Sequence, residues 1–225
     1  MNAPASLDRL RSALASPEAA SIFLADRVPF GTLRRAAVLA AFWSDADAAA
    51  SEPGETGGLR LVAIEKTGHL RRHAGQIAFP GGRMEDGESA VEAALREAQE
   101  EVGLDPRSVH TLGELPPASV MASGFDVHSV VGWWTAPTAL APVDLGEVAA
   151  VHQLSVPRLV DPRNRATWVH PSGHSGPVFL LDDLFVWGLT GHLISGLLEL
   201  AGWSQPWEEG RRLEIPHRFF RGAHS

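Results

Sequence analysis

The sequence contains no cysteine among its 225 residues. This absence excludes disulfide bonds, metal sites built from thiolates and a cysteine nucleophile. A basic run is also missing: 27 acidic residues outnumber 19 lysines and arginines, and the formal net charge is −8. Recognition of a nucleic-acid backbone requires clustered positive charge, so we expect no nucleic-acid partner.

The sequence has no long apolar run either. None approaches the roughly 20 residues that a membrane-spanning helix requires, so we expect no membrane partner. Residues 1–30 carry Asp8, Glu18 and Asp26 and lack an unbroken apolar core, which predicts that there is no signal peptide. We therefore expect a cytoplasmic globular protein. The sequence allows a homodimer and does not determine the oligomeric state.

What the chain does have is a glutamate-rich segment, GRMEDGESAVEAALREAQEEVGL, at residues 82–104. Ser89 and Glu92 form a capping box and Gly103 is placed to end a helix, so we expect a helix over about residues 89–102. Three carboxylates at positions i, i+3 and i+4 then share one face of this helix: Glu97, Glu100 and Glu101. An apolar stripe about 130° away is predicted to face the core, and it consists of Val91, Leu95, Ala98 and Val102.

Three crowded carboxylates repel one another and destabilise a bare helix. A hard cation would remove this repulsion, because Mg²⁺ prefers oxygen ligands and usually shares them with substrate phosphates. The segment therefore favours a metal site. An ordinary amphipathic helix with a solvated acidic face is the alternative, but it explains neither Arg96 nor the glycines that flank the helix.

The rest of the chain mixes predicted strands and helices. Strands are expected at residues 36–42, 59–65, 76–79, 109–114, 127–134 and 147–154. A turn is expected at Pro80-Gly81-Gly82, a proline-containing loop after residue 114, and an irregular stretch at residues 157–177. The C-terminal part predicts a hairpin over residues 179–188, which turns at Asp182-Asp183. A core helix with a leucine stripe then follows over residues 189–201.

This mixture predicts one α/β domain, built as an αβα sandwich around a mixed β-sheet. We expect the domain to cover residues 34–208. Residues 1–33 are predicted to be a helical or partly disordered leader, and residues 209–225 a C-terminal tail.

The spacing within residues 82–104 resembles the Nudix box, the signature of hydrolases that cleave a nucleoside diphosphate linked to another group. Gly82 is followed after five residues by Glu88, and seven further residues lead to Arg96-Glu97 and then to Glu100-Glu101. Every fixed position of the box agrees. The resemblance implies the Nudix fold and a hydrolase that depends on Mg²⁺ or Mn²⁺.

A second motif, LRRHAGQIAFPGG at residues 70–82, resembles the extended motif of the Nudix coenzyme A diphosphatases, L-R-x-H-x-G-x-(V/I)-x-F-P-G-G. The matching residues are Leu70, Arg71, His73, Gly75, Ile77, Phe79, Pro80, Gly81 and Gly82. The resemblance implies a small-molecule nucleotide substrate. Its diphosphate, that of coenzyme A or a derivative, would be split into 3′,5′-ADP and 4′-phosphopantetheine.

The resemblance also implies roles for acidic residues and one arginine. Glu97, Glu100 and Glu101 are the expected metal ligands and catalytic carboxylates, and Gly81 and Glu88 are expected to support the metal site. Arg96 is expected to orient a helix carboxylate. A further acid, Glu147, is open to two interpretations: a ligand or general base, or a solvated acid at the edge of a strand.

The expected substrate-binding residues come from the extended motif: Arg71, His73, Phe79 and Gly82. Arg71 can bind a phosphate through two hydrogen bonds and His73 can donate one, which suits a substrate with a diphosphate and a 3′-phosphate. A histidine that only caps a turn is the alternative for His73. Gly81 and Gly82 allow the backbone to approach a metal or phosphate closely.

Two alternative functions remain open. The first is a Nudix diphosphatase for ADP-ribose, NADH or dinucleoside polyphosphates, from which the Arg71 and His73 motif separates this chain. The second is a non-hydrolytic Nudix module that senses a nucleotide. Such modules commonly lose glutamates of the box, and here these glutamates are present.

Overall fold

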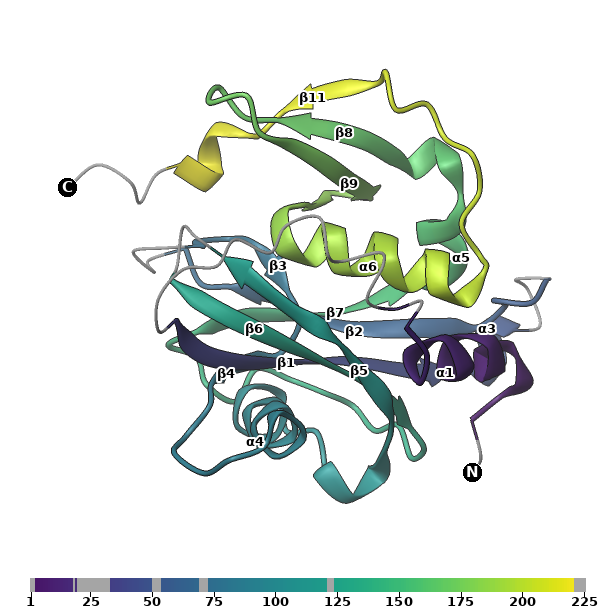
Figure 1. Ribbon diagram of the computed structural model, residues 1–225, viewed down its shortest axis with the longest axis vertical. Helices are drawn as coiled ribbons and strands as arrows, with labels where there is room; N and C mark the ends of the chain where they lie inside the picture. Colours follow the sequence, from purple (N-terminus) through teal and green to yellow (C-terminus); the bar gives the residue numbers. More distant parts are fainter. Residues whose placement is uncertain are drawn as a thin grey trace.

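The computed structural model describes residues 3–17, 19, 33–49, 54–68, 73–120 and 124–220. They form a mixed α/β fold in which a large sheet carries helices on both faces, as the sequence predicts (Figure 1). A smaller sheet adds a further layer beyond one of these helices, and of its strands the sequence predicted only the hairpin over residues 179–188.

The large sheet has seven strands. Its main path runs β3-β2-β1-β6-β5, while β4 pairs with β1 and β7 pairs with β2. β1 and β6 are parallel and the other pairs are antiparallel, so the sheet is mixed. The strands are β1 (Arg34–Ser44), β2 (Leu59–Lys66), β3 (Ile77–Ala78), β4 (Gly81–Arg83), β5 (Val109–Val120), β6 (Phe125–Trp134) and β7 (Val148–Ser155).

Alternation along β1 divides the hydrophobic core in two. Ala37, Leu39 and Ala41 pack with the residues of helix α4 (Ala90–Val102). Ala40 and Phe42 point to the opposite face and pack with helix α6 (Gly188–Ala201). Successive side chains of a strand point to opposite faces, so β1 separates the α4 side of the molecule from the α6 side.

Helix α4 begins and ends where the sequence predicts. Ser89 is the N-cap, its capping box with Glu92 is formed, and Gly103 adopts the left-handed conformation at the C-cap with φ 74°. The expected apolar stripe faces the core: Ala98 and Val102 are buried, and Val91 and Leu95 are partly buried and pack against the same cluster. The buried face also includes Ala90, Ala93 and Ala94, which the stripe did not include. Small side chains allow the helix to approach β1 closely.

On the other face of the large sheet lie α6 and an N-terminal helical segment made of η1 (Ala5–Leu7) and α1 (Asp8–Leu14). Leu7 and Leu10 are buried in the same core as the leucines of α6. Of the predicted leucine stripe on α6, Leu193, Leu197, Leu198 and Ala201 are buried and Leu189 is partly buried. Gly202 ends this helix in the left-handed conformation.

The smaller sheet has the order β10-β9-β8-β11 and lies over α6 (Figure 1). Its strands are β8 (Arg165–Val169), β9 (Ser175–Leu181), β10 (Leu184–Val186) and β11 (Arg212–Glu214). The hairpin predicted at Asp182-Asp183 is confirmed by the β9–β10 pairing. β11 pairs with β8, so the stretch expected as a C-terminal tail contributes a strand to this sheet.

Three expectations about local structure are wrong. Residues 157–177 are mostly ordered into α5 (Val156–Val160), η4 (Pro162–Asn164), β8 and the start of β9. The loop expected after residue 114 is part of β5, with Pro116 and Pro117 at an irregularity in the pairing with β6. The expected turn at Pro80-Gly81-Gly82 leads directly into β4, which pairs with β1. In β4, β5, β8 and β9 long-range strand pairing overrides the local preference of proline and glycine, whereas α5 and η4 each carry a proline in the first turn, where it is favoured.

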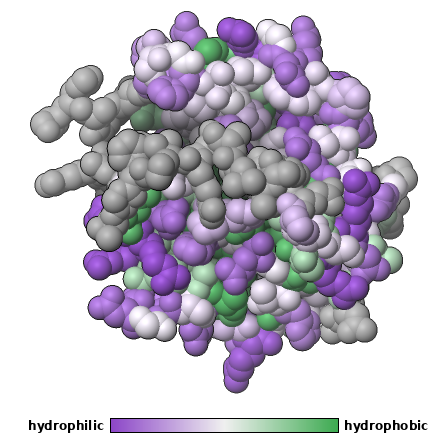
Figure 2. All heavy atoms as spheres, viewed as in Figure 1, coloured by the Kyte–Doolittle hydropathy of each residue, from purple (hydrophilic) through white to green (hydrophobic). Residues whose placement is uncertain are grey.

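The remaining short elements are α3 (Ala46–Ala49), η3 (Pro106–Ser108) and η5 (His217–Phe220). No helix in the described part of the chain is long and apolar enough to span a membrane. Hydrophilic side chains predominate on the face drawn in Figure 2, with hydrophobic ones in small scattered groups.

Candidate active site

The pairing of β4 with β1 brings two glycines against helix α4. Gly81 lies opposite Val38 and Gly82 opposite Ala37. A Cβ added at Gly82 would meet the Cδ and Oε1 atoms of Glu97 at 2.5 Å, so a side chain at this position would displace the Glu97 carboxylate. The Gly81 N–H donates a hydrogen bond of 2.8 Å to Oε2 of Glu101. The glycine pair therefore positions two of the three helix carboxylates that the sequence singles out.

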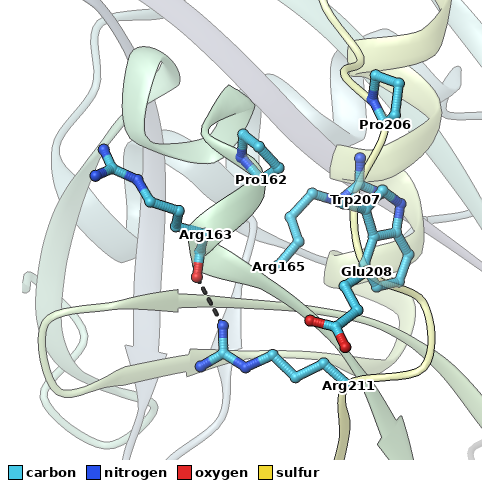
Figure 3. A pocket seen from close by; sticks show the side chains of 7 residues that line it. All are labelled: Pro162, Arg163, Arg165, Pro206, Trp207, Glu208 and Arg211. Atoms are coloured by element: carbon cyan, nitrogen blue, oxygen red, sulfur yellow. Dashed lines mark hydrogen bonds between the residues drawn. The ribbon is translucent and has the colours of Figure 1, made fainter.

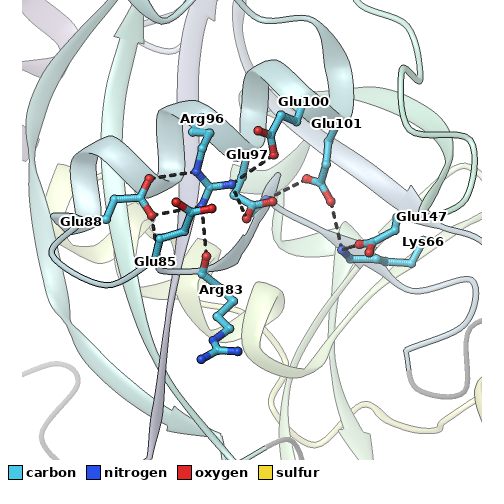
Figure 4. A network of polar contacts seen from close by, with 10 residues as sticks. Lys66, Arg83, Glu85, Glu88, Arg96, Glu97, Glu100, Glu101 and Glu147 are labelled. Atoms are coloured by element: carbon cyan, nitrogen blue, oxygen red, sulfur yellow. Dashed lines mark hydrogen bonds and ion pairs between the residues drawn. The ribbon is translucent and has the colours of Figure 1, made fainter.

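Glu101 is the most deeply buried of these glutamates, with 3% of its surface exposed. Lys66, from the end of β2, donates to its Oε1 atom at 3.2 Å. The same ammonium group lies 3.7 Å from Oε2 of Glu147, whose side chain is 56% exposed. Lys66 thus connects the helix to the residue before β7 (Figure 4), and the structure brings Glu147 to the site.

Arg96 holds the other carboxylates of the helix. Its guanidinium forms a two-point contact with Glu88 at 2.9 and 3.1 Å and also donates to Glu97 at 2.9 Å and Glu100 at 3.1 Å. A further hydrogen bond of 3.1 Å reaches the carbonyl oxygen of Arg83. Figure 4 shows the guanidinium between Glu88 on one side and Glu97 and Glu100 on the other. This geometry agrees with the expected orienting role.

Burial and charge act in opposite directions on these glutamates. Burial raises the pKa of Glu97 and of Glu101 above the usual carboxyl value, although hydrogen bonds from Arg96 and Lys66 oppose the shift. The Arg96 hydrogen bond lowers the pKa of Glu88, and Glu88 in return raises the pKa of Arg96. Ionisation without a bound cation is therefore least favourable for Glu97 and Glu101, the two carboxyls next to the glycine pair.

The donor set suits a hard divalent cation, since it consists of carboxylate oxygens with no sulfur or imidazole. The three helix glutamates do not converge on a point as they stand: within the described ranges no three acidic or histidine side chains are close enough to hold an ion. In this structure the positive charge next to the three glutamates comes from Arg96 and Lys66, which form ion pairs with them. Glu100 is also more solvent-exposed than its two neighbours, with 59% of its side chain accessible.

A cavity of about 410 Å³ opens beside the Arg96 network. It lies between the β4 end and helix α4, and its lining residues are Arg83, Met84, Glu85, Asp86, Arg96 and Glu97. The loop of residues 83–88 is tied to the site because the backbone N–H of Glu85 donates to Glu88. The space is large enough for a phosphate-bearing group next to the Glu97 carboxylate.

The residues expected to bind substrate are placed differently from one another. Arg71 lies outside the described residues. His73 is exposed, has a positive φ of 62° and contacts the Gln76 side chain through Nδ1 at 3.0 Å. Phe79 is only 2% exposed and belongs to the core on the α6 side, so the direct substrate contact expected for it is not supported. Phe79 instead anchors the motif, since Pro80 and the glycine pair follow it directly.

Lys66 is the site residue that the sequence did not single out. Its contact with Glu101 spans 35 positions along the chain. The signal that would have found it is alternation along β2: Ile64 packs on the α4 side of the sheet, so Lys66, two residues later, faces the same side.

The comparison with known protein families decides what this site belongs to. Residues 48–173 match the model of the NUDIX domain. This chain belongs to the Nudix hydrolase family. Nudix hydrolases act on phosphoanhydride bonds in small-molecule nucleotides and generally require divalent metal ions.

The relatives are consistent with this family membership. The uncharacterized Nudix hydrolase NudL of Escherichia coli K12 is 37% identical over 147 residues, which cover 61% of this chain and 72% of NudL. NudL of Salmonella paratyphi B is 38% identical over 141 residues, with the same coverage. The crystal structure of RenU, a Nudix hydrolase from M. smegmatis, aligns with a TM-score of 0.53 at 16% identity. The alignment covers 82% of this chain and 96% of RenU, and at this level of identity it is evidence only for the fold.

Proposed function

We propose that this Nudix hydrolase cleaves the diphosphate of coenzyme A or its thioesters into 3′,5′-ADP and a 4′-phosphopantetheine. The observation that carries the proposal is the extended motif of residues 70–82. Of its last two residues, Gly81 donates a hydrogen bond to Glu101, and Gly82 lies where a Cβ would meet the Glu97 carboxylate. The motif proposed to bind the substrate therefore ends in the two glycines that lie next to the helix carboxylates.

In the proposed reaction Glu97, Glu100 and Glu101 hold Mg²⁺ or Mn²⁺. When bound, the ions neutralise charge on the diphosphate and acidify the attacking water. Water adds to one phosphorus atom, the bond from that phosphorus to the bridging oxygen breaks, and each product leaves with a terminal phosphate. No protein nucleophile takes part.

Three sets of contacts hold the carboxylates of the proposed site. Arg96 fixes Glu97 and Glu100 through its fork of hydrogen bonds. The Gly81 N–H and Lys66 fix Glu101. Glu147 shares Lys66 with Glu101 and is largely exposed, which supports a role as the group that accepts a proton from water or as a further ligand.

The test is a panel of substrates with the purified protein in Mg²⁺ or Mn²⁺, with products identified by mass. We expect coenzyme A and its thioesters to be split into 3′,5′-ADP and the matching phosphopantetheine. ADP-ribose, NADH and diadenosine polyphosphates serve as the competing substrates. A preference of an order of magnitude for ADP-ribose or NADH would replace the proposed substrate and leave the metal chemistry intact.

The role proposed for Arg71 has a matched control in its neighbour Arg72, which occupies a variable position of the motif. Arg71→Ala should lower kcat/KM for coenzyme A, and the loss of transition-state stabilisation should be about 1.5–3 kcal/mol, the value of a charge-assisted hydrogen bond. Arg72→Ala should leave kcat/KM unchanged. If Arg71 contacts the 3′-phosphate, the loss should be smaller with dephospho-coenzyme A. Equal losses with both substrates would place the contact at the diphosphate.

A further inference from the structure

A second cavity, of about 580 Å³, lies in the layer of the smaller sheet (Figure 3). Its walls come from η4, the start of β8 and the segment between α6 and β11. The lining residues are Pro162, Arg163, Arg165, Pro206, Trp207, Glu208 and Arg211. None of them belongs to the site around α4, which packs against the opposite face of the large sheet.

Arg165 is the feature of this cavity that needs an explanation. It is 2% exposed, and its guanidinium lies between two aromatic rings, 4.7 Å from the centre of Trp207 and 5.0 Å from that of Phe179. Two hydroxyl groups accept its hydrogen bonds: Ser195 at 2.8 Å and Ser204 at 3.4 Å. Its Nε atom is buried without a hydrogen-bond partner, and no carboxylate of the described residues forms an ion pair with it.

A buried cation with neutral partners is unfavourable, and burial accordingly lowers the pKa of Arg165. Carboxylates of Glu199 and Glu209 act on it only at longer range. The positive charge at the base of the cavity is therefore incompletely compensated. An anion in the cavity would supply the missing charge in a region of low dielectric.

Two further arginines stand at the wall of the cavity. Arg211 donates from Nη1 to the carbonyl oxygen of Arg163 at 2.7 Å, which ties the segment before β11 to η4. The Arg163 side chain is paired with Asp161 through contacts of 2.6 to 3.0 Å. Arg211 uses one of its guanidinium nitrogens in this bond, and Figure 3 shows its side chain extended across the cavity beside Glu208.

The cavity wall is also held in place by its backbone. Thr167 on β8 donates its N–H to the carbonyl of Arg211 at 2.8 Å and its hydroxyl to that of Glu209 at 2.7 Å. The Arg211 N–H in turn donates to the Glu208 carbonyl. These bonds fix the segment that carries Trp207, Glu208 and Arg211, so a ligand would meet a largely formed site.

We propose that this cavity binds a nucleoside phosphate. Arg211 and Arg165 supply positive charge for the phosphate, the Trp207 indole supplies an aromatic surface for a base, and the Glu208 carboxylate can accept from ribose hydroxyls. The volume lies in the range of small-molecule sites. This site is separate from the proposed diphosphatase site and does not depend on the proposed substrate of that enzyme.

The experiment is calorimetric titration of the full chain with AMP in the presence of EDTA, which leaves the metal-dependent site without its ions. Adenosine and inorganic phosphate are titrated in parallel. We expect one saturable AMP site per chain, with adenosine and phosphate each binding at least about 10-fold more weakly. The proposal would be overturned if AMP showed no saturable binding, or if inorganic phosphate bound as tightly as AMP.

Variants locate the binding. Arg211→Ala should weaken AMP binding about 10-fold or more, whereas Arg212→Ala, which removes an exposed arginine of β11 outside the cavity, should leave it unchanged. Trp207→Leu should also weaken AMP more than phosphate. Melting curves identify any variant that does not fold, and Trp207→Leu is the independent probe of the same cavity if Arg211→Ala fails. AMP affinity that is equal in wild type, Arg211→Ala and Trp207→Leu would show that the ligand binds elsewhere.

Discussion

Arg96 and Arg165 lie on opposite sides of the large sheet, and their environments differ in kind. Arg96 contacts three carboxylates, and the hydrogen bond with Glu88 raises its pKa. Arg165 contacts two hydroxyl groups and two aromatic rings, and burial lowers its pKa. Arg96 thus holds together an excess of carboxylates, whereas Arg165 is a buried positive charge that its neighbours compensate only in part.

The comparison indicates what each region accepts. On the α4 side the helix glutamates exceed the positive charge of Arg96 and Lys66, so the region favours cations. On the side of the smaller sheet Arg163 is paired with Asp161, and the cavity lining then holds Arg165 and Arg211 against one carboxylate, Glu208, so the cavity favours anions. Although the net charge of the chain is −8, its described residues thus gather acidic side chains on the α4 side and unpaired arginine charge in the second cavity.

The largest expected effect is the loss of hydrolysis when the metal is removed, which should leave the second cavity unaffected. Excess EDTA should abolish hydrolysis, and added Mg²⁺ or Mn²⁺ should restore it, because the glutamate cluster suits hard cations. AMP binding at the second cavity should persist in EDTA. Full hydrolytic activity in excess chelator would contradict a metal role for the α4 carboxylates.

The next effect concerns Glu101. Glu101→Gln should reduce kcat by about 10²-fold or more, because it removes charge that the proposed transition state requires. Stability should be kept or raised, since the amide oxygen can still accept from Gly81 and a buried charge is removed. The control is Glu92→Gln, on the first turn of the same helix, which should keep kcat. A Glu101→Gln protein with wild-type kcat would assign this residue to structure alone.

Replacement of each arginine by methionine tests the comparison directly. Arg96→Met should destabilise the fold by about 1.5–3 kcal/mol, because it leaves partly buried Glu88 and Glu97 without their hydrogen bonds. Arg165→Met should change stability by less than about 1 kcal/mol, because an apolar side chain of similar length replaces a poorly compensated buried charge. Chemical denaturation measures both. A larger loss for Arg165→Met than for Arg96→Met would reverse our interpretation of the two environments.

The smallest expected effect is a pH dependence on the α4 side. The folded pKa of Glu97 and Glu101 is raised, so their contribution to stability is present at low pH and is lost as the pH rises through the folded pKa. In EDTA, the Glu97→Gln/Glu101→Gln double variant should therefore gain more in melting temperature over wild type at about pH 8 than at about pH 5. An equal difference at both pH values would show that these carboxyls do not titrate abnormally.

The helix that carries the active-site carboxylates could be read from the sequence in detail. Ser89, Glu92 and Gly103 set its ends through contacts with residues close in the chain, and the 3.6-residue period fixes the face shared by Glu97 and Glu101. Six of the seven strands of the large sheet were also predicted, because their apolar runs reflect burial between two layers of helices, whereas β4 lies where a turn was expected. The spacing of the glutamates and glycines was sufficient to identify the family.

Only the tertiary structure decided which residues join these elements. Lys66 meets both Glu101 and Glu147, Phe79 lies in the core, and residues 157–177 form part of a second sheet. Arg165 is placed between Phe179 and Trp207, and no local pattern indicates that these segments meet. The physical reason is range: periodicity and capping depend on neighbours within a few residues, whereas strand pairing and charge compensation join positions far apart in the chain.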